Sequence, residues 1–140
     1  MNFFETYLGE RYSLSWDEMI RCHEMMLSEI QNDMDAKELY GDIIECATRY
    51  AIYRANWGLW NREKQVEHDE SRSMCHDSLI TKFDILARYL KTIGCQAEWR
   101  ESLGDVKKDP TYRKRIGDCA CFLVFINSLS VRETKYFIVI

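Results

Sequence analysis

Proline and glycine are scarce in this chain of 140 residues, which contains one proline and six glycines. Both residue types interrupt regular structure, so their scarcity leaves little room for long loops or for a fold with many tight turns. The chain is 46% apolar and 30% charged, which is typical of a globular protein rather than of a disordered segment. We therefore expect residues 1–140 to form a single α-helical domain that needs no disulfide for stability.

Long apolar runs and an excess of positive charge are also missing. The longest uncharged stretch, residues 119–131, is shorter than the roughly 20 residues that a membrane-spanning helix needs. The N-terminal stretch carries Glu5 and Glu10 and lacks the basic and apolar regions of a signal peptide, so we expect a cytoplasmic protein with free thiols. A net charge of −4 argues against general nucleic-acid binding, which depends on neutralising phosphates.

The predicted fold is an all-α, single-domain bundle of four main helices. Its organising stretch is residues 43–60, where apolar side chains fall on nearly every side of a helix, so the second helix should be central and mostly buried. Short extra helical turns are expected at residues 2–8 and 95–108. The main helices are expected to begin at Ser15, with Glu18 completing a capping box; near Asp35, with Glu38; around Cys75, ending at Gly94; and at Asp109-Pro110.

Two parts of this helix pattern leave alternatives open. The polar stretch 61–73 is interpreted as the end of the second helix followed by a turn, or as a continuous helix that protrudes into solvent. The fourth helix, from Asp109 onward, is apolar over most of its surface, so it is either enclosed or part of an interface. Residues 136–140 are aromatic and β-branched and favour an extended segment that docks on its own bundle or on another copy. A homodimer through the fourth helix and residues 136–140 is therefore one hypothesis.

Two groups of residues are candidates for binding a ligand or a partner. Arg54 lies on the core-facing side of the second helix, where a guanidinium should be ion-paired or should line a cavity. Tyr53 and Trp57 belong to an aromatic row on the same helix, which is either plain core or the wall of a pocket. Near the start of the fourth helix a basic cluster opposes the helix dipole and favours an anionic or acidic partner; it includes Lys107, Arg113 and Arg115.

Motifs of catalysis are absent, because the chain contains no Gly-x-Ser-x-Gly, no phosphate-binding glycine loop and no zinc-type spacing of histidine and cysteine. Arg62 and His68 have a spacing that resembles the Arg-x4–6-His motif of HEPN-type ribonucleases, which are helical bundles that use the pair in RNA cleavage. The resemblance covers seven residues, and chance alone predicts roughly 0.7 such pairs in this chain. It implies His68 as a general acid or base, and His76 is the nearest second histidine.

The leading functional hypothesis is a small helical protein that acts by protein–protein binding, as regulatory and immunity proteins do, without catalysis, metal or cofactor. One alternative is a hydrolytic enzyme of ribonuclease or metal-dependent type that uses Arg62, His68 and His76. Another is a small-ligand binder that uses Arg54 and the aromatic residues of the second helix. Convergence of the histidines would favour the enzyme, and a closed apolar pocket would favour the ligand binder.

Overall fold

The computed structural model describes residues 14–104 and 113–128, and these residues form an all-α bundle, as predicted. The helices in chain order are α2 (Trp16–Ile30), α3 (Met34–Trp57), α4 (Arg62–Thr92), α5 (Glu98–Ser102) and α6 (Arg113–Ser128). The expected N-terminal turn at 2–8, the Asp109-Pro110 start and the segment 136–140 lie outside the described residues.

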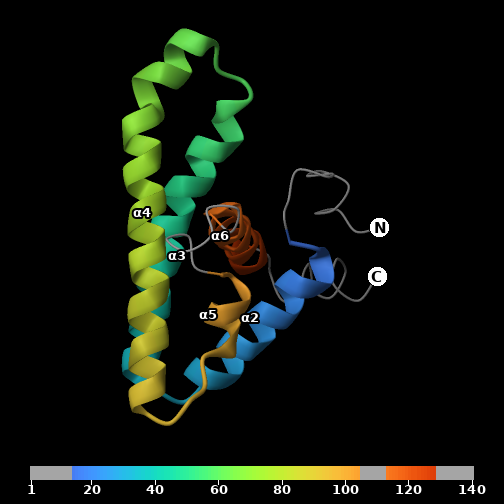
Figure 1. Cartoon of the computed structure of the whole chain (residues 1–140), viewed down its shortest axis with the longest axis vertical. Coiled ribbons are helices and arrows are strands. Elements are labelled where there is room, and N and C mark those ends of the chain that lie inside the picture. The colour runs from blue at the N-terminus through green and yellow to red at the C-terminus, as the bar shows by residue number, and fades with distance from the viewer. Residues whose placement is uncertain (1–13, 105–112, 129–140) are drawn as a thin grey trace.

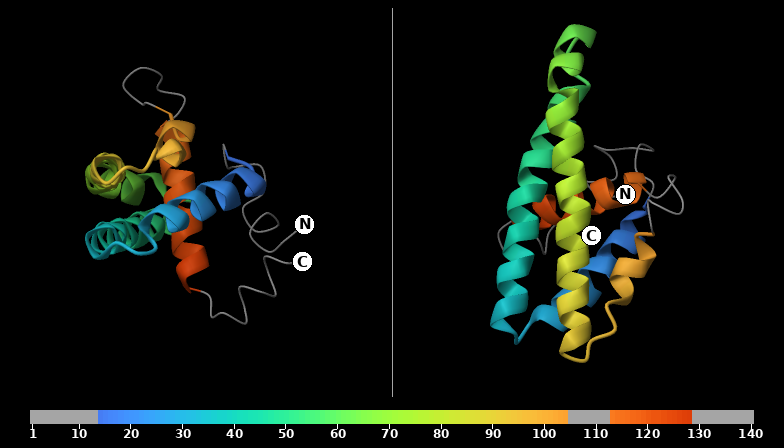
Figure 2. Two further views of the ribbon diagram at one scale, coloured as in Figure 1. Left: turned by 90° about the horizontal axis from the view of Figure 1, so that it is seen from below. Right: turned by 60° about the vertical axis from the view of Figure 1, so that its left-hand side comes forward.

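A long antiparallel hairpin of α3 and α4 dominates the molecule (Figure 1). Helix α6 crosses this hairpin and packs on both of its helices, and α2 and α5 complete the bundle on the same side of the hairpin as α6 (Figure 2). The core lies where these elements meet, and its largest fully buried side chains include Trp99, Phe83, Phe122, Met19 and Met26. The far end of the hairpin extends beyond α6.

Polar side chains set the starts of α2 and α3. Ser15 and Glu18 form the predicted capping box, with the Ser15 hydroxyl accepting from the Glu18 N–H at 3.1 Å. The second helix is capped by Asp33 rather than by Asp35, which corrects the sequence prediction. The Asp33 carboxylate accepts from the Ala36 N–H at 2.8 Å and also from the Tyr89 hydroxyl at 2.7 Å. The capping bond is local, and the sequence prediction placed the cap two residues too late because Asp35 with Glu38 presents a similar pattern.

The polar stretch 61–73 is the beginning of α4, so the interpretation of this stretch as an extension of the second helix is wrong. Helix α3 ends at Trp57, and Asn61 caps α4 by accepting from the Lys64 N–H at 2.9 Å. The Gln65 amide reaches back and donates to the Trp57 carbonyl at 2.8 Å, which satisfies one acceptor at the end of α3. From Arg62 the helix then continues without interruption to Thr92.

Helix α3 is central, as predicted, because it packs against both α4 and α6. The expectation that it is mostly buried needs correction, because its buried residues end at Tyr50 and its outward-facing Ile52 is 58% exposed. The most enclosed helix is α6, which is buried continuously from Ile116 to Ala120. Its Gly117 allows the close approach of α3, since a Cβ atom there would lie 2.7 Å from the Tyr50 hydroxyl oxygen.

The connection between α4 and α6 is anchored by two local features. Gly94 has a φ of +94° and ends α4, with the Cys95 N–H donating to the Leu90 carbonyl at 2.9 Å, which confirms the predicted cap. The short helix α5 confirms the helical turn expected within 95–108. It places Trp99 in the core, and the Trp99 indole N–H donates to the Glu29 carboxylate of α2 at 2.7 Å.

Candidate functional site

The part of the α3–α4 hairpin that extends beyond α6, residues 51–75, is called the arm below. No residue of the arm is buried, although Tyr50 and His76, which flank it, both are. Large apolar side chains are exposed around it, with Leu59 at its tip 82% exposed and Val66 60% exposed. An exposed group of large apolar residues in a folded chain often marks an interaction surface.

Four aromatic rings and one guanidinium pack together between the two helices of the arm; this arm cluster is Tyr53, Trp57, Trp60, His68 and Arg72. The His68 ring stacks on Trp60 with ring centroids 4.4 Å apart and an interplanar angle of 25°. The Arg72 guanidinium lies over the Trp57 ring, 4.2 Å from its centroid. The cluster holds the two helices together, yet each of its members stays partly open to solvent because no third helix covers it in the described structure.

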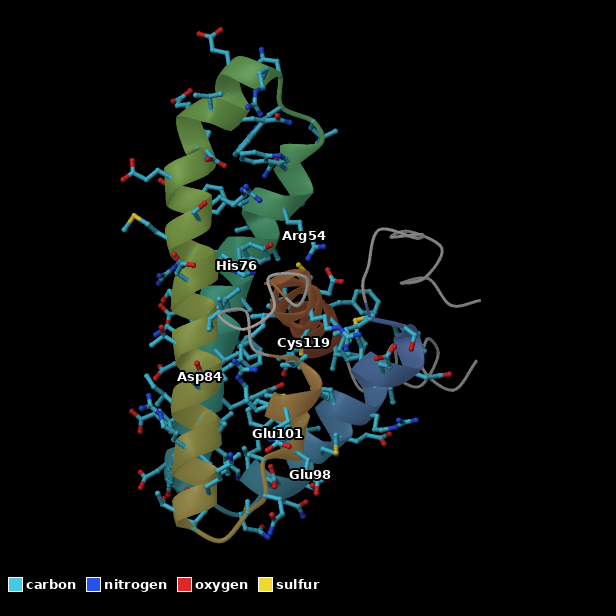
Figure 3. The ribbon with its side chains drawn as sticks, in the orientation of Figure 1. Arg54, His76, Asp84, Glu98, Glu101 and Cys119 are labelled. Atoms are coloured by element: carbon cyan, nitrogen blue, oxygen red, sulfur yellow. The ribbon has the colours of Figure 1, made fainter. Side chains whose placement is uncertain are left out.

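The base of the arm is held to α6 by an ion pair. Arg54 points from α3 toward α6 (Figure 3), where its Nη2 donates to the Asp118 carboxylate at 2.5 Å and its Nη1 lies 3.9 Å from the Cys121 Sγ. The Asp118 side chain is fully buried, and that of Arg54 is 23% exposed. Of the two roles that the sequence left open for Arg54, the structure therefore shows the ion pair.

Asp118 is the ion-pair partner of Arg54 that sequence reasoning missed. A signal was present, because Asp118 is the only acidic residue between Ile116 and Ile126, a span that is otherwise apolar or small. Next to the pair, burial raises the pKa of the Tyr50 hydroxyl, with the Arg54 charge acting in the opposite direction. The base of the arm is thus a largely buried polar contact inside the bundle rather than an open ligand site.

The two histidines and the arginine of the hydrolase hypothesis do not converge. His68 stacks on Trp60 within the arm cluster, whereas His76 is buried against Tyr50 with ring centroids 5.4 Å apart. On one helix, eight residues separate the two histidines by about 12 Å along the axis. Arg62 is exposed at the first position of α4, and its direction around the helix differs from that of His68 by about 120°.

The basic residues near the start of α6 have different surroundings. Lys107 lies outside the described residues, and Arg113 is the first residue of α6, with a side chain that is not described. Arg115 donates to the Ser102 carbonyl at 3.2 Å and lies 3.9 Å from the Glu18 carboxylate. Its contacts therefore connect α6 to the last residue of α5 and to the first turn of α2.

The thiols of Cys75 and Cys119 offer little reactive chemistry. The Cys22 and Cys119 sulfurs lie 3.9 Å apart in the core, and hydrogen bonding and burial raise the pKa of Cys119 well above its usual value. Burial raises the pKa of Cys75 to about 11. The Cys75 and Cys119 thiols are therefore protonated at neutral pH and are poor nucleophiles. Within residues 14–104 and 113–128, no group of three or more acidic, histidine or cysteine side chains could hold a metal ion.

A shallow pocket of about 210 Å³ lies between α2 and the segment around α5, away from Arg54 and the arm cluster. The Glu29 carboxylate on its wall already accepts hydrogen bonds from the Trp99 indole and from the Ala97 N–H. The pocket therefore does not connect to the aromatic residues that the sequence suggested for ligand binding.

Comparison of the chain with protein-family models, with curated proteins and with solved structures found no significant match. Among the helices that the structure describes, none is both long enough and apolar enough to cross a membrane.

Proposed function

We propose that this chain acts by binding another protein and that the tip of the arm is the contact surface. The observation that carries the proposal is that residues 51–75 form two helical segments without a single buried residue, although they contain two tryptophans and a tyrosine. Tryptophan, tyrosine and arginine are the residue types enriched at the energetic centres of protein interfaces. Tyr53 and Trp57, which the sequence pattern suggested as binding residues, both belong to this surface.

The chemistry of the arm suits a protein partner better than an anionic polymer or a small ligand. Residues 51–75 contain four basic and four acidic residues, so the arm has no excess of positive charge to attract phosphates. Leu59 and Val66 offer aliphatic contact area at and beside the tip, and the arm cluster is already ordered by its own packing. Such preorganisation lowers the entropy lost on binding.

The experiment is site-specific crosslinking in the cells from which the chain comes. A photoreactive residue at position 59, at the tip, is compared with one at position 93, where Ile93 is 44% exposed at the opposite end of α4. We expect a defined covalent adduct from position 59 that position 93 does not give. The adduct identifies the partner, which is then purified for direct measurement of binding.

The matched variants for the binding measurement are Leu59→Lys and Ile93→Lys, which add the same charge at opposite ends of the hairpin. We expect Leu59→Lys to weaken partner binding at least about 30-fold, since losing an apolar anchor and desolvating a new charge costs about 2 kcal/mol or more. Ile93→Lys should bind as the unchanged chain does. Equal adducts from both positions, or equal affinity of both variants, would refute the proposal.

The remaining hypotheses predict different results in separate assays. A homodimer through α6 and residues 136–140 would appear in sedimentation as a species of twice the chain mass that is lost when residues 136–140 are deleted. Hydrolysis by Arg62, His68 and His76 would appear as RNA cleavage that each of three alanine variants reduces.

A further inference from the structure

The side of the α3–α4 hairpin that faces away from α6 is called the outer face below. Helices α2, α5 and α6 all lie on the opposite side (Figure 2). On α3, Ile52 lies about 180° around the helix from the buried Ile43 and therefore points outward. Met34 lies five full helical turns before Ile52, so it points in the same direction. Met74 and Ile85 lie within about 20° of each other on α4 and also point away from its buried residues. The four side chains are 58%, 78%, 65% and 38% exposed, respectively.

The register of the hairpin fixes which positions of its two helices are level. Tyr89 donates to Asp33 at 2.7 Å at one end of the hairpin. Further along, the Cys46 Sγ lies 3.7 Å from the Cys75 carbonyl, and the Tyr53 ring lies 6.1 Å from His68 in the arm. The two helices are thus antiparallel without a shift in register, so moving one residue forward along α3 corresponds to moving one residue back along α4. Met34 is therefore level with residue 88, and Ile52 is level with residue 70.

We propose that the outer face binds a second copy of this chain about a two-fold axis parallel to the hairpin. Such an axis keeps equivalent residues of the two copies at the same position along the hairpin, and it places α3 of one copy over α4 of the other. Met34 then lies within three residues of Ile85 of the second copy, and Ile52 within four residues of Met74. All four exposed apolar side chains of the outer face meet across the interface, and the two hairpins form a four-helix bundle.

The distribution of charge favours the same arrangement. Residues 34–45 of α3 carry four acidic residues and one basic residue, whereas residues 77–88 of α4, which are level with them, carry two basic and two acidic residues. One of these acidic residues, Asp84, already forms a 2.6 Å ion pair with Arg100. The parallel axis places the acidic half of α3 over Lys82 and Arg88 of α4. An axis across the hairpin would instead place α3 over α3 and would lose this complementarity.

The size of the outer face matches a dimer interface. Helix α3 has 24 residues and is therefore about 36 Å long, and two adjacent helices are about 20 Å wide. The resulting footprint of about 700 Å² approaches the roughly 800 Å² per partner of a standard specific interface. Because only four large apolar side chains lie within it, we expect a dimer that dissociates in the micromolar range.

Sedimentation of the full chain from about 1 to 200 μM tests the interface, with a micromolar dimer as the expected result. The combined change Ile52→Lys and Met74→Lys should raise the dissociation constant at least about 100-fold, because four ammonium groups would be brought together in an apolar contact. Leu59→Lys is the matched control at the arm tip and should leave the dimer unchanged. Circular dichroism checks that all variants remain helical.

Charge reversal tests the orientation of the two copies. Glu38 lies within 40° of Met34 around α3, and Lys82 lies within 60° of Ile85 on α4, at nearly the same height. Glu38→Lys and Lys82→Glu should each weaken the dimer about 10-fold, and an equal mixture of the two variant chains should recover the original affinity, because both cross-copy pairs are then attractive.

Three outcomes overturn the interface: a monomer at every concentration, a dimer unaffected by the lysines at 52 and 74, or a dimer lost by deleting residues 136–140 alone. Failure of recovery in the mixture overturns the parallel orientation. The proposed partner binding at the arm tip is judged separately, because Leu59→Lys affects that binding and not the dimer.

Discussion

The ion pair between Arg54 and Asp118 should respond very differently to the loss of each partner. Arg54→Ala removes the guanidinium that pairs with the fully buried Asp118 carboxylate, and breaking a buried pair in this way costs about 3–5 kcal/mol. Asp118→Ala leaves a guanidinium that is already 23% exposed and can turn toward water, so we expect a smaller cost of about 1–2 kcal/mol. The double variant should cost less than the two single changes added together.

Urea unfolding followed by circular dichroism measures these costs. Arg49→Ala is the control, since its ion pair with Glu45 has side chains 66% and 68% exposed and should contribute only about 0.3–0.5 kcal/mol. A loss of about 4 kcal/mol would lower the melting temperature by roughly 10 °C or more in a chain of this size. Equal losses of less than about 1 kcal/mol for Arg54→Ala and Arg49→Ala would refute the reasoning, because Asp118 would then be effectively solvated.

Three further perturbations test other contacts. Gly117→Ala should cost about 1–3 kcal/mol in thermal unfolding, because its Cβ would clash with the Tyr50 hydroxyl, and Tyr50→Phe in the same chain should recover part of that cost. The Ala36 N–H and the Tyr89 hydroxyl lower the pKa of Asp33. The contribution of Asp33 to stability is therefore present above about pH 4 and is lost as the pH falls through the lowered pKa. Asp33→Asn should remove this pH dependence from the free energy of unfolding measured across that range. The raised pKa and burial of Cys119 should prevent its alkylation at pH 8 in the folded chain, with modification following unfolding by urea, as mass spectrometry of the labelled peptide would show.

Local signals in the sequence predicted the class of fold and several helix boundaries. The Ser15 and Glu18 capping box and the Gly94 cap are each defined by side chains within a few residues, so they can be recognised without tertiary information. The burial of α3 could not be predicted in this way. Its apolar periodicity continues past Tyr50 to Trp57, but α6 crosses the hairpin before that point, and local periodicity does not show where a crossing helix lies.

The same distinction between local sequence signals and tertiary packing applies to the candidate site residues. The sequence indicated that Arg54 needs a partner, since a guanidinium on a core-facing position is costly alone. It did not identify Asp118, which is 64 residues away, because pairing across helices depends on packing rather than on spacing. The boundary between α3 and α4 was misplaced for a related reason. The sequence pattern places Asn61 and Gln65 at the end of the second helix with a following turn, or in a continuous helix, although their side chains cap the ends of two separate helices.

The arm remains helical through contacts that differ in kind from those of the core. Asn61 caps the start of α4, Arg72 pairs with Asp69 at 3.0 Å, and the same Arg72 packs on Trp57. These are exposed or half-exposed contacts, each worth about 1 kcal/mol or less. Core burial, which provides most helical stability in proteins, is missing from residues 51–75. A shorter hairpin ending near α6 would bury the same core, so the side chains of the arm are better explained by contacts that form when a partner covers them.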